Sequence, residues 1–151
     1  TVGADAMTHA LVAGRPVDIR PSSISSTLGA PNVSQRTLDH VRVLVEEVLL
    51  VSDTESVEGV LTLDQASKLW VEPAAGCLVP AARRIIERVG SDARVGLVLC
   101  GGNVSFTDVA EWIEQFGVSI WTGLFWIEHN ALARFTLHHR PGVWQPDILA
   151  G

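Results

Sequence analysis

A cysteine followed by two glycines, at the end of an apolar run, is the first candidate for chemistry in this sequence. Residues 95–99 are apolar or small and include β-branched valines, which predicts a buried strand. Cys100 follows that run, and Gly101 and Gly102 come next. Glycines let a ligand approach the backbone closely, and ligands of open α/β sheets bind at the carboxyl ends of strands. Cys100 is therefore predicted either to contact a ligand or to be an inert thiol in a tight turn.

The elements that would position this turn alternate between helices and strands. Ser105 and Asp108 form a variant capping box, which predicts a helix directly after the turn. Pro73 suits the first turn of a buried, uncharged helix over residues 74–82, in which Pro80 should cause a kink or mark where the helix restarts. The hydrophobic spacing predicts further elements, namely helices over 1–13, 35–45 and 53–68 and a short strand over 46–51. This order predicts an α/β fold with a short parallel sheet flanked by helices.

The composition limits the functional classes to which this protein can belong. The chain has 151 residues and a formal net charge of −6, with no basic run, which argues against binding of nucleic acid. Two cysteines, Cys77 and Cys100, are too few and too far apart for a metal knuckle or a disulfide framework. No stretch is long enough to span a membrane and no signal peptide is evident, so a cytoplasmic location is expected. Because the sequence has no initiator Met, we expect a piece of a longer chain.

The composition changes after Gly117. Residues 118–151 hold three of the five Trp and two of the four Phe, but only two of the seventeen acidic residues. We therefore divide the chain into a segment over residues 1–117 and an aromatic-rich tail over 118–151. The tail is open to interpretation as an extension, an assembly surface or an out-of-frame translation.

Four short segments together carry a resemblance to a known family. They are TVGAD at 1–5, ISSTLG at 24–29, VEPAAG at 71–76 and LCGGN at 99–103. Their order and spacing resemble the C-terminal half of the fold type II pyridoxal-phosphate serine/threonine dehydratases, or ammonia-lyases. The resemblance implies part of the large domain of a tryptophan synthase β-like fold. It also implies a parent enzyme, a homodimer, that eliminates water from serine or threonine to give a 2-keto acid and ammonia.

The resemblance assigns cofactor contacts to four residues. Cys100 matches the position whose side chain meets the pyridine nitrogen, where a thiol can donate one hydrogen bond. Thr27 matches a loop position beside the ring, and an ordinary capping role for its hydroxyl is equally open. Glu72 matches a position near the cofactor, although a carboxylate at a helix N-terminus is stabilised by the helix dipole in any case. Gly101 belongs to the turn that approaches the cofactor.

The resemblance also implies a cation site built mostly from backbone carbonyl groups. The matching positions are Ala4, Ala6, Leu28 and Ala30. Divalent cations prefer carboxylate oxygens, and Ala6 supplies none. We therefore expect potassium rather than magnesium or calcium.

The family's Schiff-base lysine lies in an N-terminal motif that this sequence lacks, and Lys68 is the single lysine present. Lys68 stands at a predicted helix end, where a solvated side chain is expected. We therefore hypothesise that this chain alone does not form the Schiff base. Two other functions remain open: a non-catalytic α/β interaction module that uses the aromatic tail, and a dinucleotide-binding half-domain, which the absence of G-x-G-x-x-G disfavours.

Overall fold

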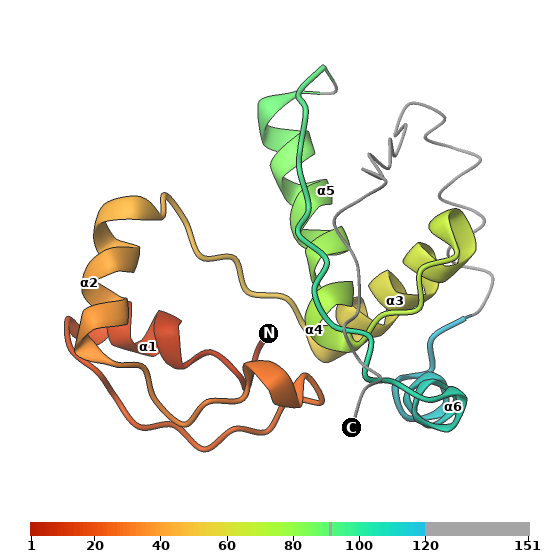
Figure 1. The fold of residues 1–151 in the computed structure, drawn as a ribbon, viewed down its shortest axis with the longest axis horizontal. Coiled ribbons are helices and arrows are strands. Elements are labelled where there is room, and N and C mark those ends of the chain that lie inside the picture. The colour runs from red at the N-terminus through yellow and green to blue at the C-terminus, as the bar shows by residue number, and fades with distance from the viewer. Residues whose placement is uncertain (91, 120–151) are drawn as a thin grey trace, which may run out of the picture.

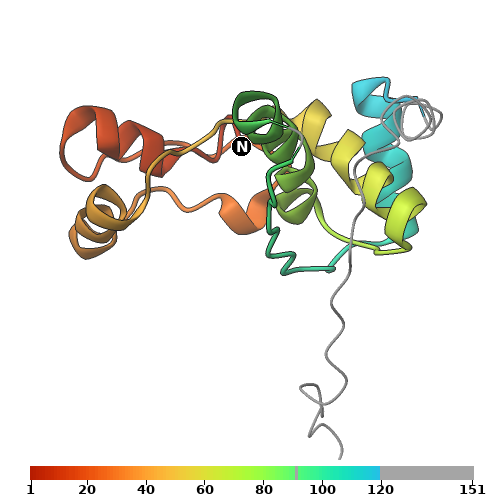
Figure 2. The same cartoon turned by 90° about the horizontal axis from the view of Figure 1, so that it is seen from above.

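The computed structural model describes residues 1–90 and 92–119. Its elements are helices joined by extended segments and loops (Figure 1). In chain order they are α1 (Ala6–Ala13), the 3-10 turn η1 (Ser26–Leu28), α2 (Gln35–Leu44), α3 (Asp53–Ser67), α4 (Pro73–Gly76), α5 (Leu78–Val89) and α6 (Phe106–Phe116). Both views place α1 and α2 together on one side of the molecule and α3 to α6 on the other (Figures 1 and 2).

Local capping signals mark where three of the six α-helices of the described residues begin. Ser52 and Glu55 form a complete capping box at α3, and Ser105 and Asp108 form another at α6. Ser34 caps α2 by accepting a hydrogen bond from the Thr37 backbone N–H at 3.1 Å. These helix starts confirm the sequence-based predictions.

The hydrophobic core lies between α3, the start of α4 and α6. Val57, Val60 and Leu63 of α3 are buried there against Val79 of α5 and Val109 of α6. The helix that hydrophobic spacing predicts over 53–68 is therefore confirmed. This core positions the N-terminal end of α4 next to the loop that contains η1, which α4 contacts.

Helices α3 and α4 approach each other through two glycines. A Cβ atom built on Gly59 would lie 2.0 Å from the carbonyl oxygen of Gly76. A Cβ atom on Gly76 would lie 2.4 Å from the carbonyl oxygen of Ser56. Because real Cβ atoms do not approach backbone oxygens so closely, only glycine fits at either position without movement of a helix.

The uncharged helix expected over residues 74–82 is interrupted. Helix α4 ends at Gly76, and α5 begins at Leu78. Pro80 explains the break, because its ring would clash with the carbonyl group of Gly76, four residues earlier, and it has no N–H to donate there. The expected disturbance is confirmed, but it lies N-terminal to the proline.

The strands expected over 46–51 and 95–99 are not confirmed, because the described residues 1–90 and 92–119 contain no strand. Residues 95–99 are extended, with Val95, Leu97 and Leu99 half-buried, whereas Val98 is 80% exposed. The expected burial of this segment is therefore wrong, and the strand itself stays unconfirmed. A strand requires a hydrogen-bonded neighbour as well as an apolar composition, and the described residues provide none.

Two arginines of α5 attach it to the first turn of α3 and to the segment that precedes α3. Arg84 donates hydrogen bonds to the backbone carbonyl oxygen of Leu50 and to the carboxylate of Glu55. Arg88 forms an ion pair with Glu47. Burial raises the pKa of Glu55, but hydrogen bonds from Ser52 and Arg84 outweigh this effect and leave the pKa below its ordinary value.

We expect the lowered pKa of Glu55 to make the protein less stable in acid. A carboxyl whose pKa is lower in the folded state stabilises the fold above the unfolded-state pKa, about 4.3 for glutamate, and loses this contribution as the pH falls through the folded-state value. Urea unfolding between about pH 6 and pH 3 should therefore show a smaller decrease for Glu55→Gln than for the parent chain. Identical pH profiles would contradict this contribution.

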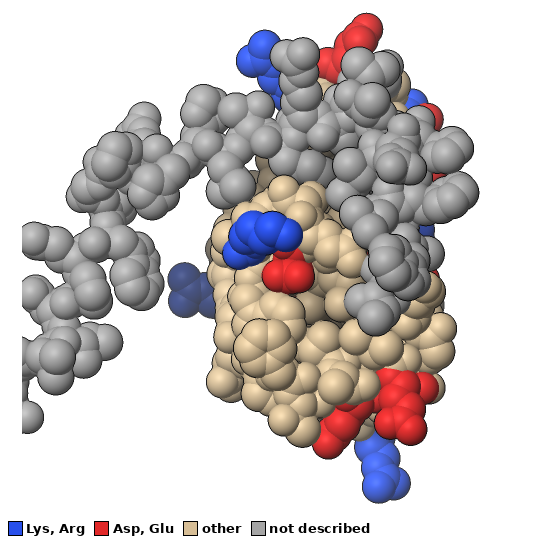
Figure 3. Space-filling model, turned by 90° about the vertical axis from the view of Figure 1, so that its right-hand side faces the viewer, with Lys and Arg blue, Asp and Glu red and all other residues tan. Residues whose placement is uncertain are grey.

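None of the helices in the described part of the chain has the length and apolar character needed to cross a bilayer. On the face drawn in Figure 3, basic side chains lie singly and uncharged atoms form most of the described surface.

Candidate functional site

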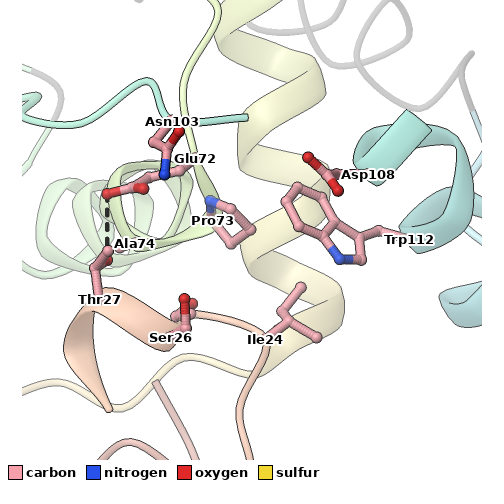
Figure 4. Close-up of a pocket in the computed structure, with 10 residues that line it drawn as sticks. Ile24, Ser26, Thr27, Glu72, Pro73, Ala74, Asn103, Asp108 and Trp112 are labelled. Atoms are coloured by element: carbon pink, nitrogen blue, oxygen red, sulfur yellow. Dashed lines mark hydrogen bonds between the residues drawn. The ribbon is translucent and has the colours of Figure 1, made fainter. Parts of the chain in front are cut away.

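A cavity of about 180 Å³ opens between the η1 loop, the start of α4 and helix α6 (Figure 4). In Figure 4, Glu72 and Asn103 lie on one side of Pro73, and Asp108 and Trp112 lie on the other. The lining residues come from four separate parts of the chain, and they are Ile24, Ser25, Ser26, Thr27, Glu72, Pro73, Ala74, Asn103, Asp108 and Trp112.

Three of the four residues assigned to the cofactor by resemblance meet at one edge of this cavity. The Thr27 hydroxyl donates a hydrogen bond to the Glu72 carboxylate at 3.2 Å, as the dashed line in Figure 4 shows. The Glu72 backbone N–H donates to the carbonyl oxygen of Gly101 at 3.3 Å. A Cβ atom on Gly101 would lie 2.2 Å from Oε1 of Glu72. Residues separated by up to 74 positions in the sequence (from 27 to 101) thus form one contact group.

Glu72 is held at this position by the first turn of α4. Pro73 occupies the start of that helix, and the carbonyl oxygen of Glu72 accepts hydrogen bonds from Ala75 and Gly76 at 2.9 Å. The residue is only 9% exposed, and no Lys, Arg or His of the described residues forms an ion pair with it. Because a buried carboxylate is stabilised by a positive partner, this edge of the cavity suits a cationic group or an N–H donor.

Asp53 holds the serine-rich loop against the core. Its two carboxylate oxygens accept hydrogen bonds from the Ser23 hydroxyl and, at 3.1 Å, from the Ile24 backbone N–H. Ser23 Oγ in turn accepts from the Ser25 N–H at 3.0 Å. From the sequence, Asp53 indicates only a favourable charge at a helix N-terminus. Its role in the loop depends on a contact across 30 residues, for which the sequence holds no local signal.

The two cysteines lie in different environments. Cys77 is half-buried, its Sγ–H donates to the carbonyl oxygen of Ala74 at 3.2 Å, and burial raises the pKa of its thiol. Cys100 is exposed and directly precedes Gly101, but it does not line the cavity. Its contact with the pyridine nitrogen therefore stays a prediction.

The expected cation site is not tested by the described residues. Its ligands would be carbonyl groups of Ala4, Ala6, Leu28 and Ala30, and the Leu28 carbonyl already accepts a hydrogen bond from Ala30 at 2.9 Å. The described residues include no cluster of three His, Cys, Asp or Glu that could hold a metal ion. That finding leaves the prediction open, because carbonyl ligands form no such cluster.

Lys68 lies outside the cavity. It is exposed at the C-terminal end of α3, and its ammonium group donates to the carbonyl oxygen of Gln65 at 3.2 Å. The aromatic-rich tail lies outside the described residues, apart from Val118 and Ser119.

Sequence reasoning named two of the lining residues, Thr27 and Glu72, as site residues and missed the other eight: Ile24, Ser25, Ser26, Pro73, Ala74, Asn103, Asp108 and Trp112. Ser25 is one of four serines in a five-residue stretch, so its type alone did not distinguish it. Trp112 lies in α6, and its place in the cavity wall depends on how α6 packs against the start of α4, which the sequence of α6 alone does not show.

Comparisons with known proteins identify the family of this chain. The family model described as "Pyridoxal-phosphate dependent enzyme" matches residues 1–101. The chain is 33% identical over 94 residues to an L-threo-3-hydroxyaspartate ammonia-lyase from Pseudomonas sp., an alignment that covers 62% of the chain and 29% of that protein. It is 32% identical over 129 residues to a mouse serine dehydratase-like protein, covering 79% of the chain and 39% of that protein.

A solved structure is also similar. The structure of an L-serine ammonia-lyase from the fungus Rhizomucor miehei matches with a TM-score of 0.63 and 26% identity, over 77% of this chain and 39% of that one. The chain thus spans less than two fifths of the length of these three proteins. Together with the family match over two thirds of its residues, these similarities show that the chain belongs to the pyridoxal-phosphate dependent enzymes of fold type II, the family of the serine and threonine dehydratases.

Proposed function

We propose that this chain forms part of the active site of a pyridoxal-phosphate-dependent ammonia-lyase acting on L-serine or L-threonine. The observation that carries the proposal is the meeting of Thr27, Glu72 and Gly101 beside one cavity. Relatives named for hydroxy amino acids, such as the fungal L-serine ammonia-lyase, support this class of substrate.

The residues around the cavity fit pyridoxal phosphate by their chemistry. The buried Glu72 carboxylate has no cationic partner among the described residues, and the buried Ser25 hydroxyl has no hydrogen-bond partner. An adduct of the cofactor with an amino acid presents an amine N–H, from which the carboxylate can accept a hydrogen bond, and oxygen atoms, to which the hydroxyl can donate. When bound, the cofactor supplies an electron-withdrawing ring that stabilises negative charge on the substrate.

The protein's part in this proposal is to bind, to orient and to exclude water. Thr27 donates to the Glu72 carboxylate and so holds it towards the cavity. The Cys100 thiol, exposed beside Gly101, is proposed to donate a hydrogen bond to the ring nitrogen. Ile24, Pro73 and Trp112 supply apolar surface that keeps water from the bound group.

Lys68 is not the Schiff-base lysine in this proposal, so the chain alone is inactive. Incubation with pyridoxal phosphate, followed by borohydride reduction and peptide mapping, should give no stoichiometric adduct on Lys68. By contrast, the chain should bind phosphopyridoxyl-L-serine, a stable amine of the cofactor and serine that needs no lysine. A stoichiometric adduct on Lys68 would contradict the first expectation, and lack of binding would contradict the proposed site. Lys68→Arg is the matched control and should bind the amine as the parent does.

Three further features complete the proposal. A potassium ion is bound through the carbonyl groups of Ala4, Ala6, Leu28 and Ala30. The full-length parent is a homodimer in the cytoplasm, a location that the two free thiols at Cys77 and Cys100 support. Residues 1–117 belong to its catalytic domain, and residues 118–151 form a separate segment.

A further inference from the structure

The hydroxyl group of Ser25 is the one buried polar group of the described cavity lining that has no partner. The residue is 1% exposed and lines the cavity, and its Oγ has no hydrogen-bond partner. Its backbone is held firmly, because the Ser25 N–H donates to Ser23 Oγ at 3.0 Å and its carbonyl oxygen accepts from Leu28 at 2.9 Å. The hydroxyl is therefore kept at the cavity by a loop that Asp53 anchors to α3.

A buried hydroxyl without a partner destabilises the folded chain. Leaving such a group unsatisfied costs about 1–3 kcal/mol, whereas an apolar residue of similar size would avoid this cost. The neighbouring serines differ in this respect, since Ser23 takes part in several hydrogen bonds and Ser26 is exposed. A buried hydroxyl that lacks a hydrogen-bond partner beside a cavity is expected where a bound ligand supplies that partner.

We propose that Ser25 is a ligand-binding residue whose hydroxyl donates a hydrogen bond to an oxygen atom of the cofactor–substrate adduct. This inference rests on the proposed function. Glu72 can accept a hydrogen bond or attract a cation, while Ser25 can donate. The cavity thus selects a ligand that presents a positive or N–H group to Glu72 and an oxygen to Ser25. Pyridoxal derivatives offer such an oxygen on the ring, and amino acids offer one on the carboxylate.

The test compares the parent chain with Ser25→Ala in the absence and presence of phosphopyridoxyl-L-serine. Without ligand, Ser25→Ala should unfold at the same temperature as the parent or a higher one, because no hydrogen bond is lost. Calorimetric titration should show a dissociation constant about five- to thirtyfold higher for Ser25→Ala, the effect of one lost hydrogen bond to the ligand. Ser25→Cys keeps the volume with a weaker donor and should bind with intermediate affinity.

Ser22→Ala makes the same chemical change in the same loop but outside the cavity lining, and it should bind as the parent does.

Phosphopyridoxyl-ethanolamine lacks the substrate carboxylate and identifies the oxygen acceptor. A Ser25→Ala defect that persists with this amine assigns an oxygen atom that both amines share, on the ring, the phosphate or the side-chain hydroxyl, and one that disappears assigns the carboxylate. Equal affinity of parent and Ser25→Ala for both amines overturns the inference but leaves the proposed function standing. Failure of the parent to bind either amine overturns both.

Discussion

Gly59→Ala is expected to lower the free energy of unfolding by about 3 kcal/mol or more, the upper end of the usual cost of overpacking. In an isolated helix this substitution would stabilise by roughly 1 kcal/mol, because alanine has the higher helix propensity. In α3, however, the new Cβ would lie 2.0 Å from the carbonyl oxygen of Gly76. The obstacle is backbone rather than the end of a flexible side chain, so α3 and α4 must separate. The steric effect therefore exceeds the propensity effect.

Chemical unfolding followed by circular dichroism measures this change. The control is Gly96→Ala, because a Cβ on Gly96 would meet no atom within 4 Å. It should change the unfolding midpoint little. If Gly59→Ala proved as stable as the parent, the close contact between the two helices would be refuted. Because α4 begins next to Glu72, Gly59→Ala should also displace the carboxylate edge of the cavity.

Features encoded by neighbouring residues were predictable from the sequence. The capping boxes at Ser52 and Ser105 join residues three positions apart, so type and spacing contain the whole signal. The left-handed ends at Gly14 and Gly117 also depend on a single residue. The order and approximate limits of α2, α3 and α6 follow from these signals.

Features that depend on distant partners were not predictable. Residues 95–99 have the composition of a strand, but a strand also needs a neighbouring backbone, which composition does not supply. The contact of Gly59 with Gly76 is a property of two helices together and leaves no local trace in the sequence of either.

The residues of the candidate site were likewise predictable from the sequence only in part. Thr27, Glu72 and Gly101 were named through resemblance to a family, and the structure brings them into contact. Asp53 and Ser25 were missed, because their roles depend on hydrogen bonds formed or left unformed after folding. Burial of a polar group without a partner is visible only in three dimensions, and it is this feature that distinguishes Ser25 from the other serines of its loop.

Gly101→Ala is expected to weaken binding of phosphopyridoxyl-L-serine at least tenfold and to destabilise the chain by about 1–3 kcal/mol. The backbone φ of Gly101 is +123°, a conformation that residues with a side chain rarely adopt. The alanine Cβ would also lie 2.2 Å from Oε1 of Glu72, so the carboxylate must move away. That movement breaks the hydrogen bond from Thr27 and removes the negative group from the edge of the cavity.

A double-mutant cycle separates the displacement of Glu72 from backbone strain. If Gly101→Ala acts on binding by breaking the contact between Thr27 and Glu72, then adding Thr27→Ala to it should weaken binding little further. In the parent background, Thr27→Ala alone should weaken binding severalfold. Strictly additive effects on the dissociation constant would show that the two residues act independently and that Gly101 does not position Glu72. Gly96→Ala, in the same extended segment but with open space around it, should bind the amine as the parent does.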